Sequence, residues 1–232
     1  STKFKNMMLT NNIAKKSSYN YLLYSHDDMY FCPNWDKFLL DEVKILGHNK
    51  FYLSSIMING DPKLRGHLNF DAGDTVYKFN ENKFLENYDK LIHEDFQGST
   101  WAPHLIHIDL WNRVGGFSEE FSPGVGSDPD LNMKLWKEGV RIFKALGQSK
   151  VYHFGSVTVR KKDNNKFKKK LGSKANKIFL LKWGITIKFF KKYYLMSDTK
   201  YEGELNGPKK NINYYIDLIK VRLTYIYNLF LQ

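Results

Sequence analysis

The stretch Tyr21 to Trp35, YLLYSHDDMYFCPNW, sets the expectations for this 232-residue chain. Its first five residues, Tyr21 to Ser25, are a short apolar and aromatic run, which is typical of a buried strand. Two carboxylates, Asp27 and Asp28, follow directly and precede an aromatic turn that contains Pro33. Because strand ends in a parallel sheet present ligand-binding groups, we expect this acid pair at a cleft that attracts a divalent cation. The alternative is that the pair only caps a helix beginning near Pro33.

A second acid pair lies far along the chain, in GVGSDPDLNMKLWKEGVRIF. Asp128 and Asp130 flank Pro129 at the start of an amphipathic helix that Gly139 ends. Asp128 has the position of an N-cap and Pro129 that of the first helical residue, so a purely structural role is one interpretation. Capping and catalysis do not exclude each other, so both roles stay open for this pair.

A histidine completes the pattern in VYHFGS, where His153 follows a predicted pair of strands, VRIFKAL and SKVYHF. A single histidine is usually a structural residue. Histidine together with carboxylates is, however, a common ligand set for metal ions.

Taken in order, these elements resemble the family 2 glycosyltransferases, which have the GT-A fold and move a sugar from a nucleoside diphosphate to an acceptor. The matching motifs are a D-x-D-like triplet at 26–28, a "vGGF-acid" segment at 113–121, an "ED-x-D-L" helix start at 127–131 and a strand with His at 151–153. The resemblance covers about Lys5 to Ser156. His26 replaces the first Asp of the triplet, and Ser127 replaces the usual Glu of the helix start.

The resemblance implies an α/β fold with a GT-A-like mixed sheet flanked by helices over residues 1–158. A basic, helical extension is expected over residues 159–232. Only 26 residues precede Asp27, so the chain as given is expected to lack most of the nucleotide-binding half of the family. A truncated chain, part of a longer protein and a natural remnant all fit this expectation.

The resemblance also assigns roles on the donor side. Asp28 and His153 would hold Mn²⁺ or Mg²⁺, which suit oxygen-rich ligation, and the single Cys32 excludes a zinc site built from cysteines. The donor, expected to be a UDP-sugar, would contact Asp27, His26 and Asn11.

On the acceptor side, Asp128 is the candidate general base, because an acceptor hydroxyl needs a nearby carboxylate to take its proton. A helix N-terminus is expected to lower the pKa of Asp128. Asp130 would support the site through hydrogen bonds, and Trp101 would either stack on a sugar or belong to the core. His104 and His107 are expected to be structural or to face solvent.

Composition bounds the remaining roles. With 42% hydrophobic and 16% aromatic residues the chain can form a sizeable core. The net charge of +12 is concentrated in residues 160–192, which hold 13 Lys or Arg and one Asp. This basic segment suits an anionic membrane surface, a polyanionic glycan or RNA, and a solvated lysine-rich face is the alternative. Nucleic acid is the least expected of these partners.

The last segment, Asn211 to Gln232, has a helical pattern with a narrow polar stripe. We therefore expect a helix that packs on two sides, against its own domain and against either a second subunit or a bilayer. No apolar run is long enough to span a membrane. The expected location is cytoplasmic, at the periphery of a membrane.

These expectations combine into a metal-dependent inverting hexosyl- or N-acetylhexosaminyl-transferase of polysaccharide biosynthesis, whose acceptor is a glycan, a lipid-linked glycan or a protein. The competing class is a noncatalytic glycan-binding or membrane-associated remnant of such an enzyme. A response to a nucleotide-sugar and Mn²⁺ discriminates the two classes.

Overall fold

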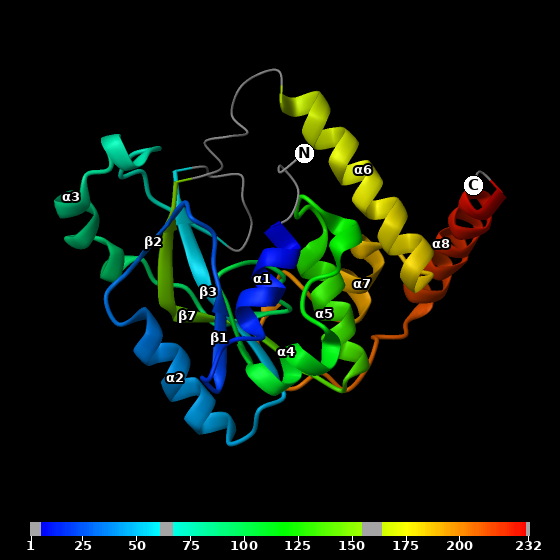
Figure 1. Cartoon of the computed structure of the whole chain (residues 1–232), viewed down its shortest axis with the longest axis horizontal. Coiled ribbons are helices and arrows are strands. Elements are labelled where there is room, and N and C mark those ends of the chain that lie inside the picture. The colour runs from blue at the N-terminus through cyan, green and yellow to red at the C-terminus, as the bar shows by residue number, and fades with distance from the viewer. Residues whose placement is uncertain (1–5, 61–66, 155–163, 231–232) are drawn as a thin grey trace.

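The computed structural model describes residues 6–60, 67–154 and 164–230. They form a mixed α/β fold with one mixed sheet flanked by helices (Figure 1). The strands are β1 (Tyr21–Tyr24), β2 (Met29–Phe31), β3 (Phe51–Asn59), β4 (His67–Asn69), β5 (Phe96–Gln97), β6 (His104–His107), β7 (Ile142–His153) and β8 (Thr199–Lys200). The helices are α1 (Asn6–Ala14), α2 (Trp35–Leu46), α3 (Glu81–Leu85), α4 (Ile108–Val114), α5 (Ser127–Lys137), α6 (Asn164–Trp183), α7 (Ile187–Tyr193) and α8 (Ile212–Phe230). Three 3-10 turns connect them, η1 (Val76–Lys78), η2 (Tyr88–Lys90) and η3 (Glu119–Phe121).

The centre of the sheet is the parallel pair β3 and β7, in the strand order β1-β6-β3-β7-β5-β8, with β2 paired to β7 and β4 to β3. Every residue of β3 is buried, which explains why its sequence, FYLSSIMIN, does not alternate with period two. Helix α2 covers one face of this pair through Leu39 and Val43. Helices α4 and α5 cover the opposite face (Figure 1).

The strand expected at Tyr21 to Ser25 is confirmed as β1, but its setting differs from the prediction. It pairs antiparallel with β6 and is half-buried along its length. The acid pair therefore follows an antiparallel strand and lies in the turn that leads to β2. Helix α2 begins after Asn34, which has a left-handed backbone. Asp27 and Asp28 consequently do not cap that helix.

The two strands expected before His153 are in fact one continuous strand, β7. Its first half pairs with the start of β3, and its second half pairs with the end of β3 and with β2. A register shift at Ser55 and Ile56 separates the two halves. Buried Ser55 and Ser149 fill the irregular region, where their hydroxyl oxygens lie 2.8 Å apart in a hydrogen bond. This continuous strand carries His153 to the turn that holds the acid pair.

Helix α5 begins two residues earlier than its sequence predicts. The N-cap is Gly126, whose φ of +83° is left-handed, so Asp128 is the second helical residue and not the N-cap. Pro129 follows inside the first turn. Backbone N–H groups there have no acceptor within the helix, so proline, which lacks an N–H, costs no hydrogen bond. A Cβ on residue 126 would lie 2.9 Å from the Ala175 Cβ of α6. Glycine at this position thus lets α6 approach closely, and Gly139 ends α5 as expected.

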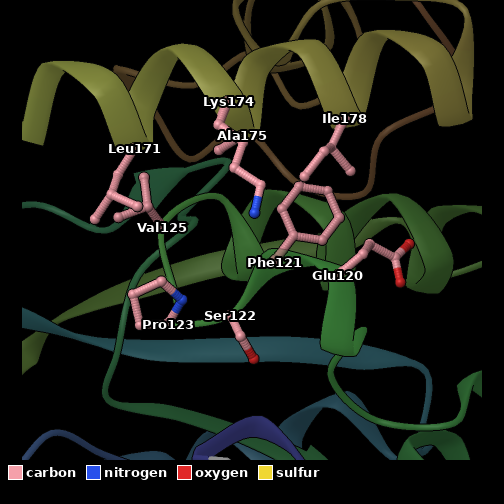
Figure 2. Close-up of a pocket in the computed structure, with 9 residues that line it drawn as sticks. All are labelled: Glu120, Phe121, Ser122, Pro123, Val125, Leu171, Lys174, Ala175 and Ile178. Carbon is pink, nitrogen blue, oxygen red and sulfur yellow. The ribbon is translucent and has the colours of Figure 1, made fainter. Parts of the chain in front are cut away.

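The C-terminal helices share the main core with the sheet. One cluster of buried side chains joins Leu131 and Trp136 of α5 to Phe179 of α6, Phe190 of α7 and Tyr214 of α8. Figure 2 shows α6 seated on η3 and the segment that follows it, with Leu171, Lys174, Ala175 and Ile178 facing Glu120, Phe121, Ser122, Pro123 and Val125. The division into 1–158 and 159–232 stays a prediction, and residues 155–163 lie outside the described part. The structure shows that the extension packs as part of the same core.

Helix α8 agrees with the helix expected over Asn211 to Gln232, of which residues 231–232 are outside the described part. Tyr214 and Val221 are its buried residues. None of the described helices combines the length and the apolar character that crossing a bilayer requires.

Candidate functional site

Three side chains from two distant segments meet at one end of the sheet. His26 and Asp28 come from the turn between β1 and β2, and His153 is the last residue of β7. Each offers a ligand atom, and the three atoms lie within 4.8 Å of one another. His153 Nε2 is 3.2 Å from Asp28 Oδ2. The sequence predicted Asp28 and His153 as metal ligands, and the structure brings His26 to the same place.

Backbone pairing fixes this geometry. In the antiparallel pair of β2 and β7, Met29 lies opposite His153. One residue further, the Phe154 N–H donates to the Asp28 carbonyl at 3.0 Å. The turn after β1 therefore cannot shift along β7 without breaking ladder hydrogen bonds, which holds Asp28 beside His153.

The donor set has the chemistry of a site for a transition metal. Burial lowers the pKa of His26, which favours the neutral imidazole that binds metals. His153 Nδ1 is buried and has no hydrogen-bond partner among the described residues. Two imidazoles with one carboxylate suit Mn²⁺ or another first-row ion better than Mg²⁺, which prefers oxygen ligands. The residues present therefore fit a divalent first-row cation, and the ligand set alone does not select Mn²⁺ over Zn²⁺ or Fe²⁺.

Asp128 is the second component of the site. Asp128 as a whole is half-buried. Its Oδ1 atom is shielded from solvent and has no hydrogen-bond partner within the described part of the chain. Burial raises the pKa of Asp128 to about 7. Asp128 in turn contributes to the raised pKa of Tyr24, as does Asp27. Tyr24 thus lies within electrostatic reach of one acid of each pair, Asp27 and Asp128.

The direction of the Asp128 pKa shift corrects the expectation from its helix position. A helix N-terminus stabilises a negative charge by about 0.3 to 1 kcal/mol. Raising a carboxyl pKa from 3.8 to about 7 corresponds to roughly 4 kcal/mol, at 1.36 kcal/mol per unit. Desolvation is the larger effect, so the lowered pKa that the sequence suggested is wrong.

An aromatic wall beside the site was missed by the sequence. The Tyr24 ring packs 5.7 Å from the His26 ring, 5.3 Å from that of His104 and 4.7 Å from that of Phe117, centroid to centroid. Tyr52 pairs its hydroxyl with His104 Nδ1 at 2.9 Å. The register that sets Tyr24 opposite His104 was not visible in the sequence, because it depends on how β1 pairs with β6.

The two histidines of β6 have different surroundings. His104 is fully buried, and burial, with a smaller contribution from His26, lowers its pKa to about 3. His107 Nδ1 accepts from the Asp109 N–H at the start of α4, which is the structural role expected. His104 is accordingly a neutral, buried neighbour of the candidate site.

Asn11 uses its amide for structure. Its Nδ2 donates to the Phe117 carbonyl at 2.8 Å, and its Oδ1 accepts from the Phe117 N–H at 2.9 Å. The preceding Gly116 has a φ of +61°, and a Cβ there would collide with Asn11 Oδ1. The side chain proposed to contact the donor therefore clamps the GGF segment, and its polar atoms are already paired.

Asp130 is also committed to structure. It is completely buried and accepts hydrogen bonds from Ser118 Oγ at 2.6 Å and from Trp183 Nε1 at 2.8 Å. Lys182 Nζ lies 3.0 Å from the same carboxylate. Asp130 joins α5 to η3 and α6, which leaves no free carboxylate for the acceptor role that the sequence suggested.

Trp101 packs mostly into the protein. Its indole N–H donates to the Ser55 carbonyl at 3.1 Å, and its ring lies 5.8 Å from that of Phe96. This contact pattern matches the core alternative for Trp101, and stacking on an acceptor sugar stays a prediction.

Comparisons with known proteins add no family to this geometry. A scan against protein-family models matches no family. A search of the curated proteins finds no match to the chain.

Proposed function

We propose that this chain carries the active site of a metal-dependent inverting glycosyltransferase of the GT-A fold, similar to the family 2 enzymes. The observation that supports it most is the meeting of His26, Asp28 and His153, from segments far apart in the sequence, in a set that could hold a divalent cation. Asp128 lies within electrostatic reach of Tyr24, whose ring packs on that of His26, and it has a carboxylate oxygen without a partner among the described residues. The order of these groups along the chain agrees with the resemblance to that family.

The proposed donor is a nucleoside diphosphate sugar, most simply a UDP-sugar. A divalent cation bound to His26, Asp28 and His153 would neutralise negative charge on the diphosphate as it leaves. Asp27 is exposed next to this cluster, and we propose that it contacts donor hydroxyl groups. The proposed acceptor is a hydroxyl group of a glycan, a lipid-linked glycan or a protein.

Asp128 acts as the general base in this proposal. Its carboxylate takes the proton of the acceptor hydroxyl while the acceptor oxygen attacks the anomeric carbon from the face opposite the diphosphate. The bond from that carbon to the diphosphate oxygen breaks, and its electron pair leaves with the diphosphate. This single displacement inverts the anomeric centre. A pKa of about 7 suits the role, because efficient bases have a pKa close to the working pH.

Calorimetric titration with UDP, in the presence of Mn²⁺ and then of EDTA, tests the proposal. We expect binding that requires Mn²⁺, that Asp28→Ala abolishes and that Asp36→Ala on α2 leaves unchanged. The two variants remove the same chemical group, so their difference isolates the metal cluster. Hydrolysis of a panel of UDP-sugars then tests turnover, and Asp128→Asn is expected to abolish it.

The opposite results are equally clear. UDP binding that EDTA does not affect, or that Asp28→Ala retains, contradicts the metal assignment. Glycan binding that ignores both nucleotide and metal favours the noncatalytic alternative.

A further inference from the structure

Helix α8 has apolar side chains on two opposite sides. Its inward side, Tyr214, Leu218, Val221 and Tyr225, packs against the main core. On its outward side lie eight large apolar residues that are 45% to 85% exposed, namely Ile212, Tyr215, Ile216, Ile219, Leu223, Ile226, Tyr227 and Phe230. We call these eight residues the outer face of α8. Figure 1 shows α8 at the edge of the molecule, with α6 beside it on the inward side.

The outer face is too large to be an incidental feature of a monomer. A large side chain has roughly 150 to 250 Å² of surface, so these exposed fractions amount to on the order of 1,000 Å². The largest apolar patch on an ordinary monomer is about 300 to 600 Å². Within the described part of the chain nothing covers the outer face. An apolar area of this size indicates a binding surface.

The charge of the protein around α8 favours one kind of partner for the outer face. Residues 164–230 contain 15 Lys or Arg and 4 Asp or Glu, whereas residues 6–60 and 67–154 together contain 14 and 18. The excess positive charge lies in residues 164–192, which hold 10 Lys and no acid, whereas α8 itself carries only Lys220, Arg222 and Asp217. The outer face therefore belongs to a nearly neutral helix that packs beside the strongly basic α6 and α7. Two copies of the chain that met through α8 would bring two such positive regions together, which disfavours a dimer. An anionic lipid surface offers both apolar depth and opposite charge.

A basic groove lies beside α8. It has a volume of about 410 Å³ and is lined by Lys137, Arg141 and Arg222 together with Met133, Trp136, Trp183, Ile185 and Tyr194. None of these described lining residues is acidic. Arg141 stacks on the Trp136 ring at 4.0 Å, which fixes the guanidinium in the groove. Arg222 belongs to α8 itself and is placed between its inward and outward sides. Such a groove suits the phosphate of a lipid headgroup.

We propose that α8 binds the surface of an anionic membrane. The outer face enters the boundary between headgroups and acyl chains, and the groove of Lys137, Arg141 and Arg222 receives a lipid phosphate. The helix lies in the plane of the surface and does not cross it. This inference rests on the outer face of α8 and on the basic residues on and beside this helix. It does not depend on the proposed transferase activity.

Co-sedimentation with vesicles tests the proposal without donor or metal. Vesicles of phosphatidylcholine are compared with vesicles in which phosphatidylglycerol replaces one third of that lipid. We expect binding to the anionic vesicles that weakens as salt is raised, and little binding to the neutral ones. The double variant Ile219→Ser, Leu223→Ser should lose binding at least tenfold. Its control, Ile45→Ser, Ile92→Ser, removes two apolar side chains that are at least as exposed and lie in residues 6–60 and 67–154, and it should bind normally.

A further variant tests the groove. Arg222→Glu should weaken binding to anionic vesicles severalfold and leave binding to neutral vesicles unchanged. Equal binding to both vesicle types, or full binding by the α8 double variant, overturns the proposal. A dimer in light scattering that the same double variant dissociates also overturns it, because a second copy would then cover the outer face.

Discussion

Replacing Asp128 with asparagine should have two effects near neutral pH. The free energy of unfolding should rise, and the proposed transfer activity should be lost. The Asp128 carboxyl has a pKa of about 7 in the folded chain against 3.8 as its ordinary value. Because the folded pKa is the higher one, the folded state binds the extra proton and loses stability as pH rises from about 4 to about 7. At 1.36 kcal/mol per unit the loss is at most about 4 kcal/mol, and partial solvent access to the residue reduces it to about 2 to 4 kcal/mol.

Urea unfolding in EDTA, repeated from pH 4 to pH 8, measures this effect. The asparagine side chain does not ionise. The unfolding free energy of the Asp128→Asn variant therefore lacks the decrease with rising pH that the carboxyl causes in the wild type. We expect the difference in unfolding free energy between Asp128→Asn and the wild type to rise by about 2 to 4 kcal/mol over this range. The new amide has its own packing and hydrogen-bond effects, but these do not depend on pH and cancel in the comparison between pH values.

A flat difference across the pH range would refute the reasoning, because it would mean that the Asp128 carboxyl is well solvated in the folded protein. The activity arm is separate. Loss of a general base lowers turnover by about 10² to 10⁴, and in the wild type transfer should fall as pH drops below about 7, where Asp128 takes up its proton. If the Asp128→Asn variant were stabilised but still transferred sugar normally, burial of the carboxyl would be supported and Asp128 would be excluded as the general base.

The other predictions concern the supports of the site. Asp130→Ala should destabilise the chain by about 2 to 5 kcal/mol in urea unfolding, because Trp183 and its other donors lose their acceptor; an unchanged midpoint would contradict this. Asn11→Ala should lower stability by about 1 to 3 kcal/mol, since both polar groups of the Phe117 backbone lose a partner, and a proteolysis assay should show earlier cleavage of the GGF segment. His26→Ala should weaken Mn²⁺ binding at least tenfold in calorimetry, and unchanged binding would exclude it as a ligand.

The local features of the site were predictable from the sequence. The strand at Tyr21 to Tyr24, the turn with the acid pair and the helix that carries Asp128 each follow from short patterns of apolar, acidic and glycine residues. These patterns depend on neighbours within a few positions, which a sequence displays directly. The pairing of Asp28 with His153 was expected only through the resemblance to a family, because no local pattern brings together two segments so far apart.

Features set by tertiary burial were not predictable in this way. The roles of Asn11 and Asp130 follow from contacts with Phe117, Ser118 and Trp183, which are remote in the sequence or lie across an irregular segment. The extension over 159–232 looked separate because of its charge. Some of its apolar residues, among them Phe179, Phe190 and Tyr214, nevertheless belong to the main core, which a count of lysines does not reveal.

The two acids of α5 differ in how completely the fold compensates their burial. Asp128 and Asp130 are two residues apart, so they point roughly 200° apart around the helix. Asp130 is completely buried and fully paired with Lys182, Trp183 and Ser118, as stability requires. Asp128 has a shielded oxygen with no partner among the described residues, and its ionisation destabilises the fold. The fold supplies partners for every oxygen of the Asp130 carboxylate. Partners for Asp128, or an uncharged asparagine in its place, would remove the remaining cost in stability. An uncompensated carboxyl within electrostatic reach of Tyr24 agrees with the general base that we propose, because perturbed pKa values are typical of catalytic groups.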